Sequence, residues 1–131
     1  MAELQCIVVT PESTALEASA QFVALPLYDG EVGIGYNHSP MIGRLGYGEM
    51  RLTVKGAIER YYVDGGFVQV ADNVVSVLTS RAIPASQVKA DVAQKQLDEA
   101  LKKPIATPEQ EQVRDRLIAQ ARAQLHLVHK A

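Results

Sequence analysis

The alternation of apolar and polar residues predicts a series of short β-strands over roughly the first two thirds of the chain. An unbroken apolar run opens the series, and the later runs alternate with a period of two, the period of a strand with one buried face. The runs predicted as strands occupy residues 4–9, 15–25, 49–54, 57–64, 67–70 and 74–78. Several short strands separated by turns are typical of an antiparallel β-sandwich or barrel, which is the fold class we predict for this part.

Glycine marks most of the predicted turns. Lys55-Gly56 separates two alternating runs and predicts a hairpin. Gly46 and Gly48 predict another turn, after a short apolar segment at 41–45. Gly65-Gly66 predicts a break between two strands.

The pattern changes near Pro84, where helical spacing replaces the period of two. No glycine or proline occurs from Ser86 to Lys103. We take Ser86 as the N-cap of a first helix, and Pro104 as the residue that stops it.

A second helix has the sharpest start signal in the chain. Thr107 at N-cap, Pro108 at N1 and Gln110 at N3 form a capping box. The short link before Thr107 predicts that the two helices form an antiparallel hairpin. The predicted apolar stripe of the second helix consists of Val113, Leu117, Ala121, Leu125 and Val128. Because the apolar stripes are thin, we expect the hairpin to be only weakly stable alone, and either to rest on something or to move.

These patterns divide the 131-residue chain into a β-sandwich over residues 1–85 and a helical hairpin over residues 86–131. The net charge of −2 argues against a nucleic-acid binder. The single cysteine, Cys6, lies in an apolar run and fits a reducing compartment. The sequence has no apolar run long enough for a membrane span and no signal-peptide pattern, so we expect a cytosolic protein that can still dock on a membrane complex.

Charge is divided unevenly between the two parts. Residues 1–87 hold five Lys/Arg and nine Asp/Glu, net −4, whereas residues 88–131 hold eight and six, net +2. On the second helix a basic flank with a spacing of four, interrupted by Ile118, consists of Arg114, Arg122, His126 and Lys130. This flank is either a solvated face or a contact for an acidic partner.

The glycine-rich stretch 25–40 is the least ordinary part of the chain, yet it lacks a catalytic pattern. It has no Gly-Lys-Ser/Thr ending and no following helix, so it is not a phosphate loop. His38 and Ser39 are adjacent on an extended segment and would point to opposite faces. His126 and His129 could share a metal ion but lack an evident third ligand. We therefore predict a binding or coupling role, with no catalytic residue, metal or cofactor.

Two motifs in this chain resemble the signatures of the epsilon subunit of F-type ATP synthases. The first consists of Leu25, Pro26, Gly30, Glu31, Gly33, Ile34, His38 and Pro40. The second consists of Gly65, Gly66, Phe67, Val70, Asn73, Val75, Val77 and Leu78. A β-sandwich followed by a helical hairpin is also the architecture of that family, so the resemblance covers essentially the whole chain.

The resemblance implies a non-catalytic rotor subunit of the central stalk, whose sandwich docks on the gamma subunit and on the c-ring of the membrane sector. It implies ring contacts at Glu31 and His38. The residues that it marks as the sandwich and gamma signature are Gly30, Gly33, Pro40, Gly65, Gly66 and Phe67. It also implies that the hairpin can extend and inhibit ATP hydrolysis, its basic flank then meeting the alpha/beta catalytic head.

The same resemblance implies a peripheral protein on the cytoplasmic face of a bacterial inner membrane, in preference to a plastid thylakoid, touching the membrane only through its complex. Some bacterial family members bind ATP on the folded hairpin through an Ile/Leu-Asp-x-x-Arg-Ala motif. Aligned through Arg122-Ala123, this chain has residues 111–116 at the motif, with its Asp, Arg and Ala displaced or missing. We therefore expect no useful ATP binding. The alternative to a rotor subunit is a free-standing β-sandwich binding module with a dimerising hairpin.

Overall fold

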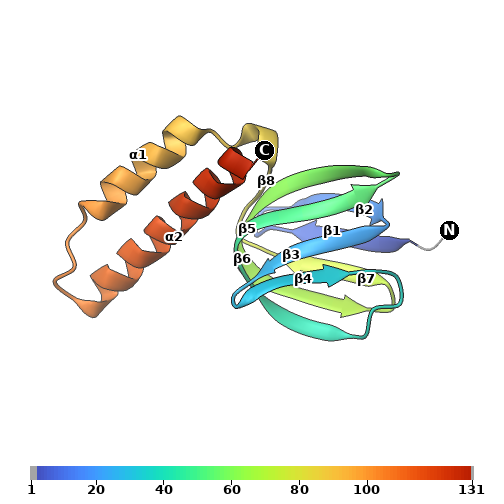
Figure 1. Cartoon of the computed structure of the whole chain (residues 1–131). Coiled ribbons are helices and arrows are strands. Elements are labelled where there is room, and N and C mark those ends of the chain that lie inside the picture. The colour runs from blue at the N-terminus through green and yellow to red at the C-terminus, as the bar shows by residue number, and fades with distance from the viewer. Residues whose placement is uncertain (1–2, 131) are drawn as a thin grey trace.

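A computed structural model describes residues 3–130, and Lys130 by its backbone alone. The chain forms a β-sandwich followed by two helices that run side by side (Figure 1). The strands are β1 (Leu4–Val9), β2 (Thr14–Ala20), β3 (Phe22–Leu27), β4 (Gly30–Ile34), β5 (Met41–Val54), β6 (Ala57–Ala71), β7 (Val74–Leu78) and β8 (Ala82–Pro84). A 3-10 turn, η1 (Ala85–Gln87), leads into α1 (Ala90–Leu101) and α2 (Pro108–Lys130).

The strands form one folded sheet in the order β2-β1-β7-β6-β5-β3-β4, with β8 paired to β6. The long strands β5 and β6 form its central hairpin and curve from one layer into the other (Figure 1). The two layers enclose an aliphatic core that includes Val23, Leu25, Met50, Leu52, Val63, Val68 and Val77. The predicted sandwich is therefore confirmed, although β1 pairs with β7 in parallel, contrary to an all-antiparallel sheet.

Two of the predicted glycine turns are wrong, because β5 and β6 run without interruption through them. A Cβ atom on Gly66 would lie 1.9 Å from the carbonyl oxygen of Leu78, and one on Gly46 would lie 2.9 Å from that of Leu27. These glycines therefore let neighbouring strands approach closely, and do not reverse the chain. The predicted hairpin at Lys55-Gly56 is confirmed, and both residues have the positive φ of a tight two-residue turn.

The first helix begins later than predicted. Ser86 lies in η1, and the N-cap of α1 is Lys89, whose side chain makes no capping hydrogen bond. Between them Val88 stays extended, and its side chain packs in a second apolar cluster with Tyr62 and Leu127. Burial of Val88 under the hairpin thus delays the helix, a tertiary effect that local capping signals do not contain.

The capping box of α2 is confirmed. The backbone N–H of Gln110 donates to the Thr107 hydroxyl oxygen (3.1 Å), and the Thr107 N–H donates to Gln110 Oε1 (3.2 Å). The predicted apolar stripe is only partly correct, since Val113 is exposed. The buried positions among the described side chains of α2 are Ile118, Ala121, Gln124 and Leu127. The helix buries this different face because it packs on α1 along its length and on the sandwich near its end (Figure 1).

Candidate functional site

The glycine-rich stretch folds mainly as a β-hairpin at the edge of the sheet. Strand β3 pairs antiparallel with β4, and Pro26 lies opposite Glu31. Gly33 in β4 is covered by the ring of Phe22, since a Cβ there would lie 2.6 Å from Phe22 Cζ. The irregular part of the stretch is confined to the residues after Ile34. The stretch is thus more regular than its composition suggests.

Glu31 takes part in a row of alternating charges that crosses the outer surface of four strands. Its carboxylate accepts two hydrogen bonds from Arg51, of 2.7 Å and 3.3 Å. Arg51 also donates to Glu49 (2.9 Å), and the other oxygen of Glu49 accepts from Nε of Arg60 (2.5 Å). We call Glu31, Arg51, Glu49 and Arg60 the charged row.

The strand register explains why Glu49 is needed in this row. Arg51 and Arg60 are directly opposite each other on β5 and β6. Like charges in that arrangement repel, and the Glu49 carboxylate, whose side chain is only 8% exposed, bridges them. The hydrogen bonds to Glu31 and then to Glu49 raise the pKa of Arg51. The row thus fixes the direction in which Glu31 points.

The charged row ends on the hairpin. Nη2 of Arg60 donates to the backbone carbonyl of Leu127 (2.8 Å), in the last turns of α2. Carbonyl groups there lack partners within the helix and attract cations. Glu49, Arg51 and Arg60 belong to neither signature motif and were not predicted as site residues. The Lys55-Gly56 turn would have revealed them, because it sets the register that places the two arginines opposite each other.

His38 lies beyond the other end of β4 from Glu31, in the loop that leads to β5. It is half-buried, and its Nδ1 donates to the Ser39 carbonyl (2.7 Å). The loop is held by Asn37, whose N–H donates to Oδ1 of Asn73 (2.6 Å). The structure therefore separates the two predicted ring contacts along the length of the edge strand. Pro40, another predicted signature residue, is exposed just before β5.

The other signature residues have separable roles. Gly65 and Gly66 have φ values of +73° and +106°, and Gly66 packs against the backbone of Leu78. The role of Gly66 is to let strands β6 and β7 pack closely.

Phe67, in contrast, is exposed. Its side chain is 57% exposed and lies opposite Leu78 (52% exposed) on the next strand. Ile42 (77% exposed) is a diagonal neighbour of Phe67 on β5. We call Ile42, Phe67 and Leu78 the outer apolar face.

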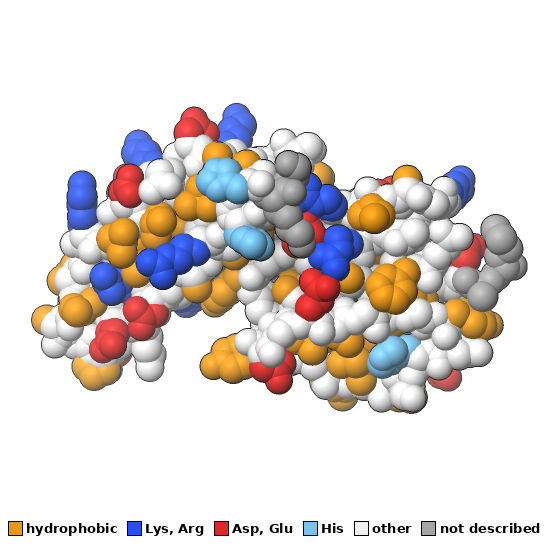
Figure 2. Space-filling model, viewed as in Figure 1, with side chains coloured by type: hydrophobic (Ala, Val, Ile, Leu, Met, Phe, Trp, Pro, Cys, Tyr) orange, Lys and Arg blue, Asp and Glu red, His pale blue; other side chains and the backbone are white. Residues whose placement is uncertain are grey.

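The predicted basic flank is divided by the fold. Arg114 is half-buried and lies 3.9 Å from Asp115, and Ile118 is buried. Arg122 and His126 are exposed and line a groove of about 360 Å³ together with Glu31 and Arg51. The Lys130 side chain lies outside the described residues. Figure 2 shows acidic and basic side chains adjoining where the hairpin meets the sandwich.

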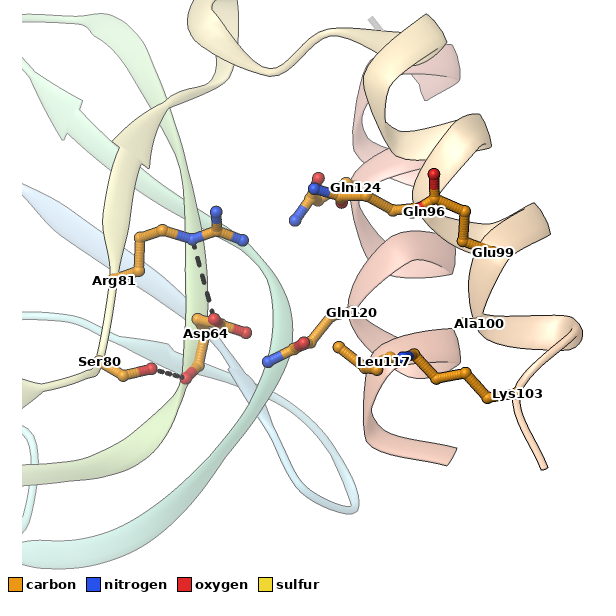
Figure 3. A pocket seen from close by; sticks show the side chains of 10 residues that line it. All are labelled: Asp64, Ser80, Arg81, Gln96, Glu99, Ala100, Lys103, Leu117, Gln120 and Gln124. Carbon is orange, nitrogen blue, oxygen red and sulfur yellow. Dashed lines mark hydrogen bonds and ion pairs between the residues drawn. The ribbon is translucent and has the colours of Figure 1, made fainter. Parts of the chain in front are cut away.

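A larger groove, of about 610 Å³, lies between the hairpin and the sandwich (Figure 3). Asp64 and Arg81 line the sandwich side, 3.8 Å apart, and Gln120 and Gln124 approach from α2. Nε2 of Gln124 is buried, and the Gln124 side chain is close enough to the Tyr62 hydroxyl to lower its pKa. The hairpin therefore touches the sandwich chiefly near the end of α2, through Leu127, and leaves the polar groove open.

Tyr62 is the residue of the sandwich on which the end of α2 packs. It is completely buried, packs against Val88 and Leu127, and donates its hydroxyl to Oδ1 of Asp64 (2.9 Å). Burial raises the pKa of the Tyr62 hydroxyl, and the Asp64 carboxylate raises it further.

Among the described residues no group of three His, Cys, Asp or Glu is placed to hold a metal ion.

The ATP motif has a better match in the first helix than the one found through Arg122. Leu97 and Asp98 reproduce its first two positions, but Leu101 replaces the Arg and Lys102 the Ala. In the structure Asp98 is exposed and accepts a hydrogen bond from Gln94 (3.1 Å). The missing arginine removes the group that would pair with a phosphate. We therefore still predict no useful binding, and a calorimetric titration that showed micromolar affinity for ATP would contradict this.

Neither helix in the described part of the chain is long and apolar enough to cross a membrane. The family model of the ATP synthase delta/epsilon chain β-sandwich domain matches residues 3–85. An ATP synthase epsilon chain of Rhodopirellula baltica is 55% identical over 122 residues, which span 93% of this chain and 95% of that relative. An epsilon chain of Desulfitobacterium hafniense is 44% identical over 86 residues, which span 66% of this chain and 65% of that relative.

The fold also has a counterpart among solved structures. A chain in the mitochondrial ATP synthase of Euglena gracilis, in a structure that includes the c-ring, superposes with a TM-score of 0.84 over 94% of this chain and 79% of that chain. At 20% identity this similarity concerns the fold alone. The family model and the relative from Rhodopirellula baltica go further, and this chain belongs to the delta/epsilon family of ATP synthase chains.

Proposed function

We propose that this chain is a non-catalytic rotor subunit of an ATP synthase, which docks on gamma through the outer apolar face and on the c-ring through the edge around β4. The observation that carries the gamma contact is the cluster of Ile42, Phe67 and Leu78, three large side chains that are each more than half exposed. A contiguous exposed apolar cluster of this kind marks a protein-binding surface. Arg44 beside it lies over the ring of Tyr28, 4.7 Å from its centroid, and supplies a polar rim.

The ring contact is proposed for the edge strand because Glu31 and His38 lie at its two ends, near the surface. Both would meet polar loops of the ring. The complex would hold the chain at the cytoplasmic face of a bacterial inner membrane, with no direct lipid or nucleic-acid contact. We further propose that Arg122 and His126 meet the catalytic head when the hairpin leaves the sandwich, with Arg114 and Lys130 extending that surface.

The experiment that tests this function is reconstitution with the gamma subunit. Sedimentation should show that the chain is a monomer alone and forms a one-to-one complex with gamma. Phe67→Ser should weaken that complex by about tenfold to a hundredfold, the usual range for an aromatic anchor. Phe22→Ser is the matched control, since Phe22 is 43% exposed but lies at the far end of β5 from Ile42. Equal affinities for the two variants would contradict docking through the outer apolar face.

The same reconstitution tests inhibition by the hairpin. A chain truncated after Ser86 keeps every strand, so it should still bind gamma. ATP hydrolysis by the assembled enzyme should rise with the truncated chain, because the hairpin can no longer enter the catalytic head. Unchanged hydrolysis would rule out inhibition by the hairpin and leave the rotor role intact.

A further inference from the structure

The charged row connects the edge strand β4, at one side of the sheet, to the last turns of α2. We propose that it couples the two: a partner that draws the Glu31 carboxylate away from Arg51 weakens the docking of the hairpin on the sandwich. The partner would carry amide or cationic groups that compete with Arg51 for that carboxylate. That this partner is the c-ring rests on the proposed function, whereas the coupling within the chain does not.

The coupling arises because a single buried carboxylate serves both ends of the row. One oxygen of Glu49 accepts from Arg51 and the other from Arg60. With Glu31 in place, two carboxylates neutralise two arginines. Once Glu31 is withdrawn, Glu49 is the one carboxylate among the described residues that pairs with the two opposed arginines, so one positive charge is unbalanced between neighbouring strands.

Arg60 transmits this change to the hairpin. Its Nε is held by Glu49, and this contact directs Nη2 at the Leu127 carbonyl, 2.8 Å away. The Leu127 side chain is buried against Tyr62 and Val88, so the hydrogen bond and the apolar contact form at the same place. Because the hairpin touches the sandwich chiefly at this one place, its docking depends on both the hydrogen bond and the apolar contact. Loosening Arg60 therefore shifts the equilibrium toward the released hairpin.

The groove beside the row supplies the surface on which a partner can act. It is lined by Glu31 and Arg51 from the sandwich, and by Arg122 and His126 from α2. The Glu31 side chain is 53% exposed, so a partner reaches it without unfolding the chain. Glu49, by contrast, is almost completely covered. The row thus has one accessible end and one buried centre, as a coupling element needs.

Thiol labelling of the isolated full-length chain tests the coupling. Val88→Cys places a thiol in the docking cluster, where Val88 is 8% exposed, so its reaction with a maleimide reports release of the hairpin. In that background Glu31→Gln, which mimics withdrawal of the carboxylate, should raise the labelling rate about twofold to fivefold. Arg60→Met should raise it about tenfold. The double variant should react no faster than Arg60→Met alone, because both changes act through Glu49.

Two controls keep the result specific. Glu59→Gln removes the same charge from β6, but Glu59 is exposed and bonds only the Tyr61 hydroxyl among the described residues, so labelling should not change. Cys6 is fully buried in the core, and burial raises its pKa to about 12, so its own labelling reports opening of the sandwich. Equal rates for Glu31→Gln and Glu59→Gln, or a parallel rise at Cys6, would overturn the coupling. Neither outcome bears on gamma binding.

Discussion

Gly66→Ala should destabilise the sandwich by about 4 kcal/mol, the largest effect that we expect from any single methyl group in this chain. Two costs add. Gly66 has a φ of +106°, a conformation that costs an L-residue about 1–2 kcal/mol. The new Cβ would also lie 1.9 Å from the Leu78 carbonyl oxygen, a backbone atom in the paired strand β7. Strands β6 and β7 would have to separate, and overpacking of this kind costs about 1–3 kcal/mol.

Gly56→Ala is the matched control for this prediction. Gly56 also has a positive φ, of +80°, but an added Cβ there would have no atom within 4 Å. It should therefore cost only the conformational part, about 1–2 kcal/mol. Urea unfolding of the three proteins gives both differences. If the two alanine variants proved equally stable, the close approach of β6 to Leu78 would be disproved.

The contrast between these two glycines also shows what the sequence could and could not predict. The Lys55-Gly56 turn was predictable, because a two-residue hairpin turn requires positive φ and the flanking runs alternate. Gly65-Gly66 has the same local appearance, yet it lies inside a 15-residue strand. Gly66 is needed because the backbone of the neighbouring strand β7 lies close to it at Leu78, and that contact belongs to the tertiary fold.

The charged row and the buried face of α2 also depend on contacts of the tertiary fold, which local sequence patterns do not contain. Glu49 and Arg51 fall on the polar face of an alternating strand, which the sequence predicts to be solvated. The end of α2 covers that face, so Glu49 becomes buried and Arg60 binds a helix carbonyl. Likewise the basic flank runs along a helix with its spacing of four, but Ile118 within it is buried because α2 packs against both α1 and the sandwich. The capping box, whose partners are three residues apart, needed no such information.

Docking of the hairpin gives the second large effect: Tyr62→Ala should destabilise the protein by about 3 kcal/mol and release α2. Tyr62 is the largest completely buried side chain and lies beneath both Leu127 and Val88. Because the isolated hairpin buries little apolar surface, a released α2 should fray, and trypsin should cleave after Arg122 about tenfold faster. Leu101→Ala is a control of the same kind on an exposed hairpin residue and should change neither quantity.

Tyr62→Phe distinguishes the contribution of the Tyr62 ring to hairpin docking from the contribution of its hydroxyl to stability. The ring still supports the hairpin, so trypsin cleavage should stay slow, while loss of the bond to Asp64 should cost about 1 kcal/mol at neutral pH. Because the folded-state pKa of Tyr62 is raised above the ordinary value of 10.0, its contribution to stability is complete below that pH and declines above it. The unfolding free energy of the wild type should therefore fall relative to Tyr62→Phe by about 1.4 kcal/mol per pH unit above about pH 10. Parallel stability curves for the two proteins across this range would show that the Tyr62 hydroxyl is not buried against Asp64.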